Sequence, residues 1–268
     1  ARPPADPGRH HLMQVTYDSQ PAPGQAVNED LVVTGDRFAV VLDGATATPG
    51  VETGCIHTVA WYVHQLGGQL AQLLLNDPHA SLPDTLAAAM RGVCTLHAIT
   101  CDLDNPDNPS STVAMVRETH TAVEVFVLAD SPVVVRRRDG TVAAHCDDRI
   151  DHLPGYTPEI VRDHRNAPGG FWVAGSRPEA AYEALTTTID RDAIEYAGLF
   201  SDGASRLVER HGRSWAELLT LLEQEGPAEV LRQVRTADAE APADPQRHRG
   251  KTHDDATAVG CRFPAHCQ

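Results

Sequence analysis

Aromatic and basic residues are both scarce in this sequence. Phe, Trp and Tyr make up 5% of its 268 residues, so Val, Leu, Ile and Ala must fill the core. Lys and Arg number 22 against 37 Asp and Glu, giving a formal net charge of −15. Because nucleic-acid backbones require a basic protein surface, this balance argues against a nucleic-acid partner.

Long apolar segments are missing as well. No apolar run approaches the roughly 20 residues of a membrane span, and the opening stretch, ARPPADPGRHHLM, lacks the apolar centre of a signal peptide. We therefore expect no membrane association and a cytoplasmic location. Six cysteines occur, none in a C-x-x-C pair, and we expect them to be reduced and mostly buried, at positions 55, 94, 101, 146, 261 and 267. Without C-x-x-C or H-E-x-x-H, the sequence argues against a zinc site.

Apolar periodicity and turn residues divide the chain into elements. Residues 1–24, rich in Pro and Gly, are expected to be irregular, and 25–268 to form one domain. Within that domain, 141–192 is expected to be a variable insert of long loops and short helical pieces. We predict helices over 53–76, from Ser81 onward, over 215–225 and over 227–238, strands at 31–44 (a hairpin turning at Gly35-Asp36), 111–117, 122–130, 132–140, 193–203 and 255–263, and a loop at 240–251.

The order of these elements indicates the fold class. Strands that follow one another directly favour antiparallel sheets, and the helices come in separate blocks rather than alternating with strands. This order favours an α+β protein with helices packed outside a β-sandwich over a doubly wound parallel sheet.

Acidic residues recur where the predicted strands begin or end. Asp43-Gly44 and Asp202-Gly203 follow strongly apolar runs, and Asp254 precedes the last one. A carboxylate at a strand end is held by a rigid element while its oxygens stay accessible. Mg²⁺ and Mn²⁺ prefer oxygen ligands, and a water bound between two such ions is acidic enough to attack phosphorus. Any one Asp-Gly pair is explained by turn formation alone, whereas the whole set favours a metal site.

Six segments in order resemble the metal-dependent, type 2C family of serine/threonine protein phosphatases, as a remote bacterial-type member. They span most of the chain: VNED (27–30), VVLDGA (40–45), SSTVAMV (110–116), VFVLADSPVVV (125–135), GLFSDGA (198–204) and HDDATAV (253–259). The resemblance implies a four-layer αββα sandwich with two Mg²⁺ or Mn²⁺ ions between its two mostly antiparallel sheets. It also identifies the insert at 141–192 with the variable flap that shapes substrate choice.

The resemblance further implies a role for each matching residue. Asp43 would bridge both ions and Gly44 would offer its carbonyl oxygen, with Asp202 and Asp254 completing the primary ligands. Glu29 or Asp30 would bind directly or through water, and Asp130 matches the acid of a third, weaker metal. Catalysis would run through water activated by the ions that Asp43, Asp202 and Asp254 hold.

Several positions depart from the family pattern. No Arg lies within a few residues before the Asn-Glu-Asp segment to hold the substrate phosphate, and no His follows directly after Asp43-Gly44. Ala129 stands in place of the Gly before Asp130, and Arg206 stands where an acid often follows the Ser-Asp-Gly motif. The insert contains several arginines, one of which could replace the missing phosphate ligand, and the candidates are Arg162, Arg165 and Arg177.

Three functions are compatible with these observations. The leading hypothesis is a monomeric phosphatase that hydrolyses phosphoserine or phosphothreonine in proteins without a covalent intermediate. The second is a catalytically degenerate family member that acts as a binding or regulatory module, which the departures favour and the retained aspartates oppose. The third is a phosphatase of a small phosphorylated metabolite, which the sequence does not distinguish from the first.

Overall fold

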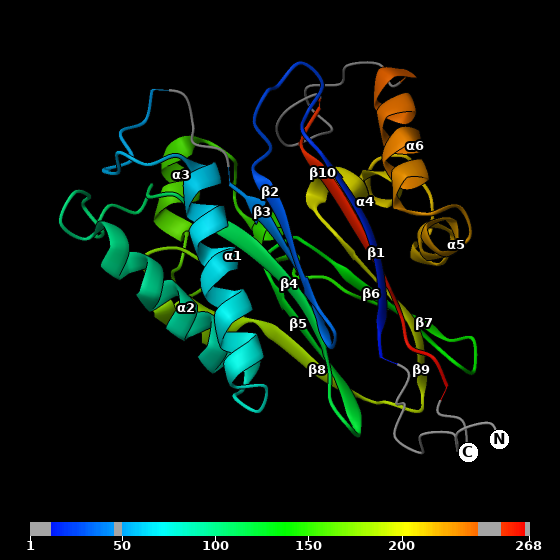
Figure 1. The fold of residues 1–268 in the computed structure, drawn as a ribbon. Coiled ribbons are helices and arrows are strands. Elements are labelled where there is room, and N and C mark those ends of the chain that lie inside the picture. Colours follow the sequence, from blue (N-terminus) through cyan, green and yellow to red (C-terminus); the bar gives the residue numbers. More distant parts are fainter. Residues whose placement is uncertain (1–11, 46–49, 241–252, 266–268) are drawn as a thin grey trace.

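Two antiparallel sheets form the centre of the computed structural model, which describes residues 12–45, 50–240 and 253–265 (Figure 1). The first sheet has the strand order β1-β10-β9-β6-β7, comprising Gln14–Gln20, Ala256–Arg262, Ile194–Phe200, Val133–Arg137 and Val142–His145. The second has the order β2-β3-β4-β5-β8, comprising Asp30–Gly35, Phe38–Gly44, Ser111–Glu118, Ala122–Leu128 and Leu185–Asp190.

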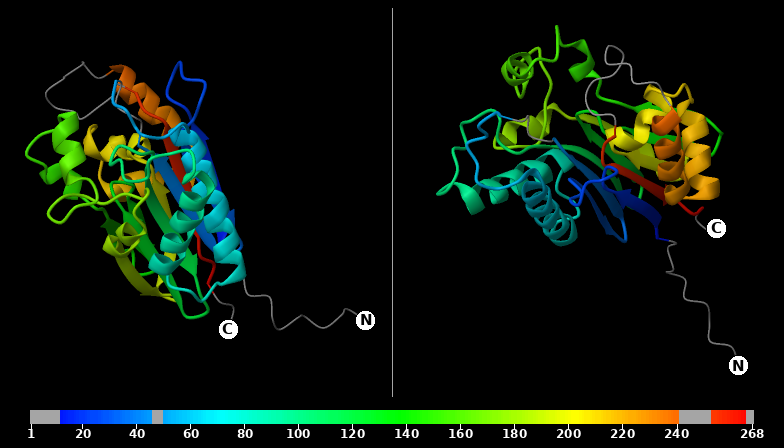
Figure 2. Two further views of the ribbon diagram at one scale, coloured as in Figure 1. Left: turned by 90° about the vertical axis from the view of Figure 1, so that its left-hand side faces the viewer. Right: turned by 90° about the horizontal axis from the view of Figure 1, so that it is seen from above.

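Helices cover the outer faces of both sheets. Viewed from above, α1 and α2 lie on one side of the strands and α5 and α6 on the other (Figure 2). The helices are α1 Val59–Asn76, α2 Leu82–His97, α3 Pro158–His164, α4 Asp202–Glu209, α5 Trp215–Glu225 and α6 Pro227–Glu240, with 3-10 turns η1 Arg149–His152 and η2 Pro178–Glu183. The predicted αββα sandwich is confirmed. No described helix combines the length and the apolar character needed to cross a membrane.

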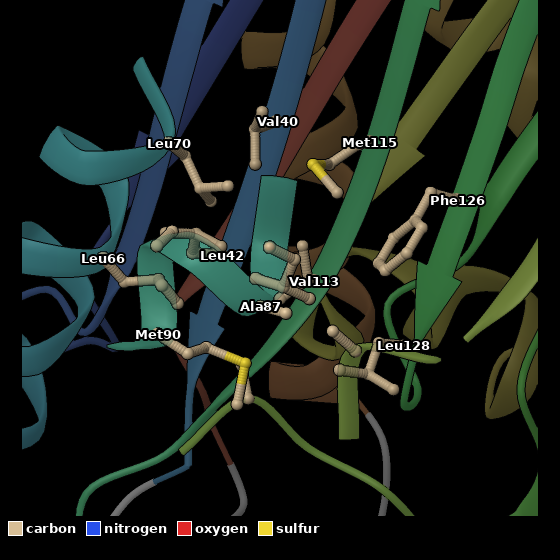
Figure 3. Close-up of a cluster of buried hydrophobic side chains, with 14 of the residues drawn as sticks. Val40, Leu42, Leu66, Leu70, Ala87, Met90, Val113, Met115, Phe126 and Leu128 are labelled. Carbon is tan, nitrogen blue, oxygen red and sulfur yellow. The ribbon is translucent and has the colours of Figure 1, made fainter. Parts of the chain in front are cut away.

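The central strands are apolar throughout because both of their faces are buried. Along β3, Val40 and Leu42 point toward α1 and α2, whereas Ala39 and Val41 point into the layer between the sheets. Figure 3 shows the layer under the helices, where side chains of β3, β4 and β5 meet those of α1 and α2. This packing fixes the strand ends that carry the acidic residues.

Helix α1 begins later than the apolar period predicts. The predicted start at residue 53 is wrong: Thr58 is the N-cap, and its hydroxyl accepts a hydrogen bond from the Trp61 amide at 3.1 Å. Ile56, which fits the periodic stripe, lies outside the helix and is 73% exposed. An N-cap hydroxyl thus fixes the boundary that apolar spacing could not.

Helix α2 starts as predicted, and it ends at His97. Ser81 caps it, since its hydroxyl accepts from the Asp84 amide and donates to the Asp84 carboxylate. Apolar residues continue at helical spacing past this end, but Leu96 is 53% exposed and Ile99 lies beyond the helix, 99% exposed. The predicted helix over 215–225 is confirmed as α5, which begins with a capping box at Ser214 and Glu217.

Four further predictions need correction. Residues 1–24 are not irregular throughout, since Gln14–Gln20 form β1, a polar edge strand held by pairing with β10. The insert 141–192 includes two strands, β7 and β8, one at an edge of each sheet. The strand predicted over 193–203 ends at Phe200, and the helix α4 begins at Asp202. Of the five described cysteines only Cys261 is buried, and none forms a disulfide. The predicted loop at 240–251 falls almost wholly outside the described residues.

Candidate metal centre

The acidic residues of the second sheet meet where β2 begins and β3 ends. Asp30 and Asp43 face each other as register partners of the antiparallel β2–β3 pair. On the other side of β3, Asp43 pairs with Thr112 of β4, and the Ser111 hydroxyl donates to the Asp43 carbonyl at 3.0 Å. Strand pairing alone therefore brings the first two carboxylates together.

The first sheet brings Asp202 and Asp254 to the same end of the sandwich. Ser201 binds the start of β10 twice: its amide donates to the Thr257 carbonyl, and its hydroxyl accepts from the Thr257 amide at 2.9 Å. Asp202 follows directly and donates its own amide to the Asp43 carboxylate at 3.1 Å. The two sheets are thus joined at the acidic cluster itself.

Close contacts, rather than turn geometry, require the glycine in each of the two Asp-Gly pairs. A Cβ at Gly203 would lie 1.8 Å from the Asp255 carbonyl oxygen, and one at Gly44 would lie 2.7 Å from that of Glu29. Neither glycine has a positive φ. Absence of a side chain lets the segments carrying Asp43 and Asp202 approach their neighbours, so the simple turn interpretation does not account for them.

Charge repulsion and burial together make these carboxyls weak acids. Burial, and then the nearby charges of Asp254 and Asp130, raise the pKa of Asp202 to about 8. Burial, followed by Asp30, Asp202, Asp254 and Asp130, also raises the pKa of Asp43 well above its usual value. The ionised form of such a cluster is unfavourable unless protons or cations neutralise its charge.

Asp30 is the most enclosed member of the cluster. Its Oδ2 accepts a hydrogen bond from Thr257 Oγ1 at 2.7 Å, whereas its Oδ1 is buried without a hydrogen-bond partner among the described residues. Burial is the main cause that raises the pKa of Asp30 to about 7. A buried acceptor left without a donor is unusual, and a bound cation or its water would satisfy it.

Glu29 and Asp130 flank this cluster. Glu29 lies beside it and lines the neighbouring pocket, while its carbonyl accepts from the Gly44 amide at 3.1 Å. Asp130 follows Ala129, whose φ of 67° is the left-handed conformation that glycine adopts more easily. Ala129, which stands in place of the family's usual Gly, thus has a backbone conformation that a glycine would adopt easily. Asp255, next to Asp254, is structural: its carboxylate accepts from the amides of Ala22 and Glu29.

Arg206, which the sequence showed only as a departure from the family pattern, has a defined place. It is 1% exposed, and its guanidinium contacts Asp254 at 3.3 Å and Asp238 at 3.4 Å. Asp238 in turn accepts from His211 at 3.0 Å. A buried cation therefore orients Asp254 and offsets part of the negative charge, which no sequence pattern revealed.

A pocket of about 230 Å³ opens beside the acidic cluster. Its described lining includes Glu29 and Ala45 from the cluster side, together with His57, Asn108 and Arg165. Of the three candidate arginines, only Arg165 lines this pocket, and its Nε is buried without a hydrogen-bond partner in the part of the chain that the structure describes. Arg162 forms an ion pair with Asp107, and Arg177 is exposed in an adjoining hollow that all three arginines line.

His57 is a lining residue that sequence reasoning missed. The predicted helix over 53–76 placed it on a helical face, whereas it precedes α1 and its ring stacks on Trp61 at 3.8 Å between centroids. Only the N-cap at Thr58 could have indicated that His57 lies in a loop.

Comparison with known proteins identifies the family. The model of the protein phosphatase 2C family matches residues 25–235, so the chain belongs to that family. Asp254 lies beyond the matched range. None of the curated proteins with which the chain was compared is significantly similar to it.

Solved structures share the fold at low sequence identity. The serine/threonine phosphatase PstP/Ppp of Mycobacterium tuberculosis is 20% identical with a TM-score of 0.60, covering 95% of this chain and 100% of that one. Stp1 from Staphylococcus aureus is 16% identical with a TM-score of 0.58, covering 96% and 99%. The catalytic domain of PstP in complex with two manganese ions is 18% identical with a TM-score of 0.58, covering 94% and 98%.

Proposed function

We propose that this protein is a metal-dependent phosphatase that hydrolyses phosphoserine or phosphothreonine in proteins. The observation that carries the proposal is the meeting of carboxylates from both sheets in one cluster, where mutual repulsion and burial raise the pKa of Asp43 and Asp202. Membership of the protein phosphatase 2C family supports the same function.

The residues of the cluster fit two Mg²⁺ or Mn²⁺ ions. Asp43, the carbonyl of Gly44, Asp202 and Asp254 would be the primary ligands, with Glu29 and Asp30 binding directly or through water and Asp130 serving a third ion. When bound, these ions would neutralise the cluster and supply an acidic water as the nucleophile for phosphorus. The buried, unpartnered oxygen of Asp30 and the hard oxygen donor set suit such ions.

The chain's own residues would orient this centre and hold the substrate. The Asp202 amide fixes one oxygen of Asp43, Thr257 fixes one oxygen of Asp30, and Arg206 contacts Asp254. Arg165 would replace the family's missing phosphate ligand, because it lines the pocket beside Glu29 and its Nε lacks a protein acceptor. An arginine donates paired hydrogen bonds to phosphate oxygens.

Phosphate release from a phosphoserine peptide tests this function. We expect release to require Mn²⁺ or Mg²⁺ and to stop when a chelator is added. A phosphorylated metabolite, assayed in parallel, should turn over more slowly; the reverse order would favour the metabolite as substrate. A rate equal to that of buffer with every metal and both substrates would overturn the enzyme and leave the binding-module alternative, which the family departures favour.

A further inference from the structure

A second cluster of potential metal ligands lies outside the acidic centre. Cys55, His97 and Cys101 each present a donor atom, and the three atoms lie within 4.8 Å of one another. Cys55 belongs to the loop before α1, His97 ends α2, and Cys101 follows four residues later. Helix α1 begins and α2 ends at the same end of the molecule, which brings the three together (Figure 1).

We propose that Cys55, His97 and Cys101 bind a thiophilic cation, and that this cation is Zn²⁺. Thiolate and imidazole donors select Zn²⁺ over Mg²⁺ and Mn²⁺, whereas the acidic centre has only oxygen donors. The proposal is therefore independent of the proposed phosphatase function. The sequence argued against zinc because it lacks C-x-x-C and H-E-x-x-H. These patterns detect only ligands that are neighbours in the chain, whereas the present three come from separate segments.

The spacing of the donor atoms suits a tetrahedral ion. The Cys55 Sγ lies 3.5 Å from His97 Nδ1, close to the roughly 3.6 Å that Zn–S and Zn–N bonds of about 2.3 and 2.0–2.1 Å imply. The Sγ atoms of Cys55 and Cys101 are 3.0 Å apart. A tetrahedral ion would hold two sulfurs about 3.8 Å apart, so small side-chain rotations would complete the site. A water would fill the fourth position.

The surroundings of His97 leave its ring nitrogens available to a cation. The residue is 3% exposed, and among the described residues its Nε2 has no hydrogen-bond partner, while Nδ1 lies against the Cys55 thiol. Burying an imidazole without strong hydrogen bonds is costly, and a bond from Nδ1 to a cation offsets that cost. The His57 amide also donates to Cys55 Sγ at 3.4 Å, which would stabilise a thiolate there.

A cation at this place would tie together two loops that form a wall of the pocket. The loops already touch, since the Asp102 amide donates to the Gly54 carbonyl at 2.8 Å and Asn105 donates its side-chain amide to the Glu52 carbonyl at 3.0 Å. The same loops contribute Thr53, His57 and Asn108 to the pocket lining. Zinc binding would therefore stabilise the pocket wall without entering the acidic centre.

Cobalt(II) substitution in the reduced full-length chain tests this proposal. Co²⁺ bound by thiolates gives a sulfur-to-cobalt charge-transfer band, whereas Co²⁺ on carboxylates does not. We expect one equivalent to produce the band, Zn²⁺ to displace it, and Cys55→Ser or Cys101→Ser to lose it. Cys146→Ser, an exposed cysteine outside the cluster, and Asp202→Asn, in the acidic centre, should both retain the band.

Thermal unfolding distinguishes a variant that has lost the metal site from one that fails to fold. Zn²⁺ should raise the Tm of the parent and of Cys146→Ser by more than that of a folded Cys101→Ala, since all three keep the acidic centre. No thiolate band in the reduced parent, or a band that survives both single substitutions in the cluster, would overturn the proposal. A Cys55–Cys101 disulfide in the isolated protein, combined with no Co²⁺ binding after reduction, would also overturn it and identify a redox pair.

Discussion

Arg165 and Arg177 show how the surroundings of a residue decide its role. Both belong to the insert at 141–192, and the sequence offers no reason to prefer either. The structure places Arg165 beside the acidic cluster with an unpartnered Nε, and leaves Arg177 exposed. The contrast gives a matched pair for testing phosphate binding.

Replacing Arg165 by Ala should raise KM for a phosphopeptide. Loss of a charge-assisted contact to phosphate costs about 1.5–3 kcal/mol, or roughly 10- to 100-fold. Steady-state kinetics of Arg165→Ala and Arg177→Ala, each with its melting temperature, would measure the effect. Unchanged KM in a folded Arg165→Ala, or an equal rise in both variants, would remove Arg165 from the substrate site.

Sequence reasoning at this scale identified residues that carry a pattern and missed those that act through contacts. Asp43, Asp202 and Asp254 stand out because each borders an apolar strand. Arg206 and Thr257 were not recognised, because their partners lie 48 and 227 residues away along the chain. His57 was placed on a helix, since the apolar spacing extends to residues before Thr58, the N-cap at which α1 begins.

At the scale of elements, α1 contains two adjacent glycines with opposite surroundings. A Cβ at Gly67 would lie 2.4 Å from Leu31 Cδ2 of β2, whereas a Cβ at Gly68 would meet nothing within 4 Å. Gly67 thus lets the helix approach the sheet, and Gly68 only weakens the helix. A glycine inside a helix is either a weak point or a place of close packing, and here each of the two glycines has one of these roles.

The substitution Gly68→Ala should stabilise the protein by about 0.5–1 kcal/mol, because alanine has the higher helix propensity. Gly67→Ala should instead destabilise it by about 1–3 kcal/mol, since Leu31 must move out of a packed layer. Denaturant unfolding of both variants measures the difference. Equal stabilisation by the two changes would show that α1 does not pack on β2 as described.

Strong local signals predicted most elements correctly. The hairpin at Gly35-Asp36, the capping box of α5 and the doubly buried central strands were all recognisable because each depends on nearby residues. Edge strands β1, β7 and β8 were missed, since their stability comes from pairing with distant strands rather than from their own apolar pattern.

At the scale of the whole molecule, the acidic cluster links folding stability to pH. The pKa of Asp202 rises from an ordinary 3.8 to about 8 in the metal-free fold. The folded state then holds a proton that the unfolded chain has released between about pH 4 and pH 8. Stability contributed by this group is therefore present at low pH and lost as pH rises through that window.

The metal-free parent should thus lose more stability than Asp202→Asn as pH is raised from about 5 to about 8. Mn²⁺ should offset the loss and raise the Tm of the parent more at pH 8 than at pH 5, because protons compete with the metal. Melting curves with and without metal would test this. The same pH dependence in both proteins would show that Asp202 keeps an ordinary pKa.

Asp202 and Asp36 provide the most direct test of the proposed metal-dependent hydrolysis. Asp202→Asn removes a proposed ligand while keeping the shape of the side chain. Asp36→Asn makes the same change at an exposed position in the β2–β3 turn, away from the strand ends that carry Asp30 and Asp43.

The measurement is Mn²⁺-dependent phosphate release from a phosphoserine peptide by the parent and both variants. We predict that Asp202→Asn lowers turnover by at least about 100-fold, since residues that merely support a metal ligand are already worth 10- to 100-fold. Asp36→Asn should release phosphate at the parent's rate, and a chelator should stop phosphate release by both proteins. Full Mn²⁺-dependent activity in Asp202→Asn would contradict the proposed centre.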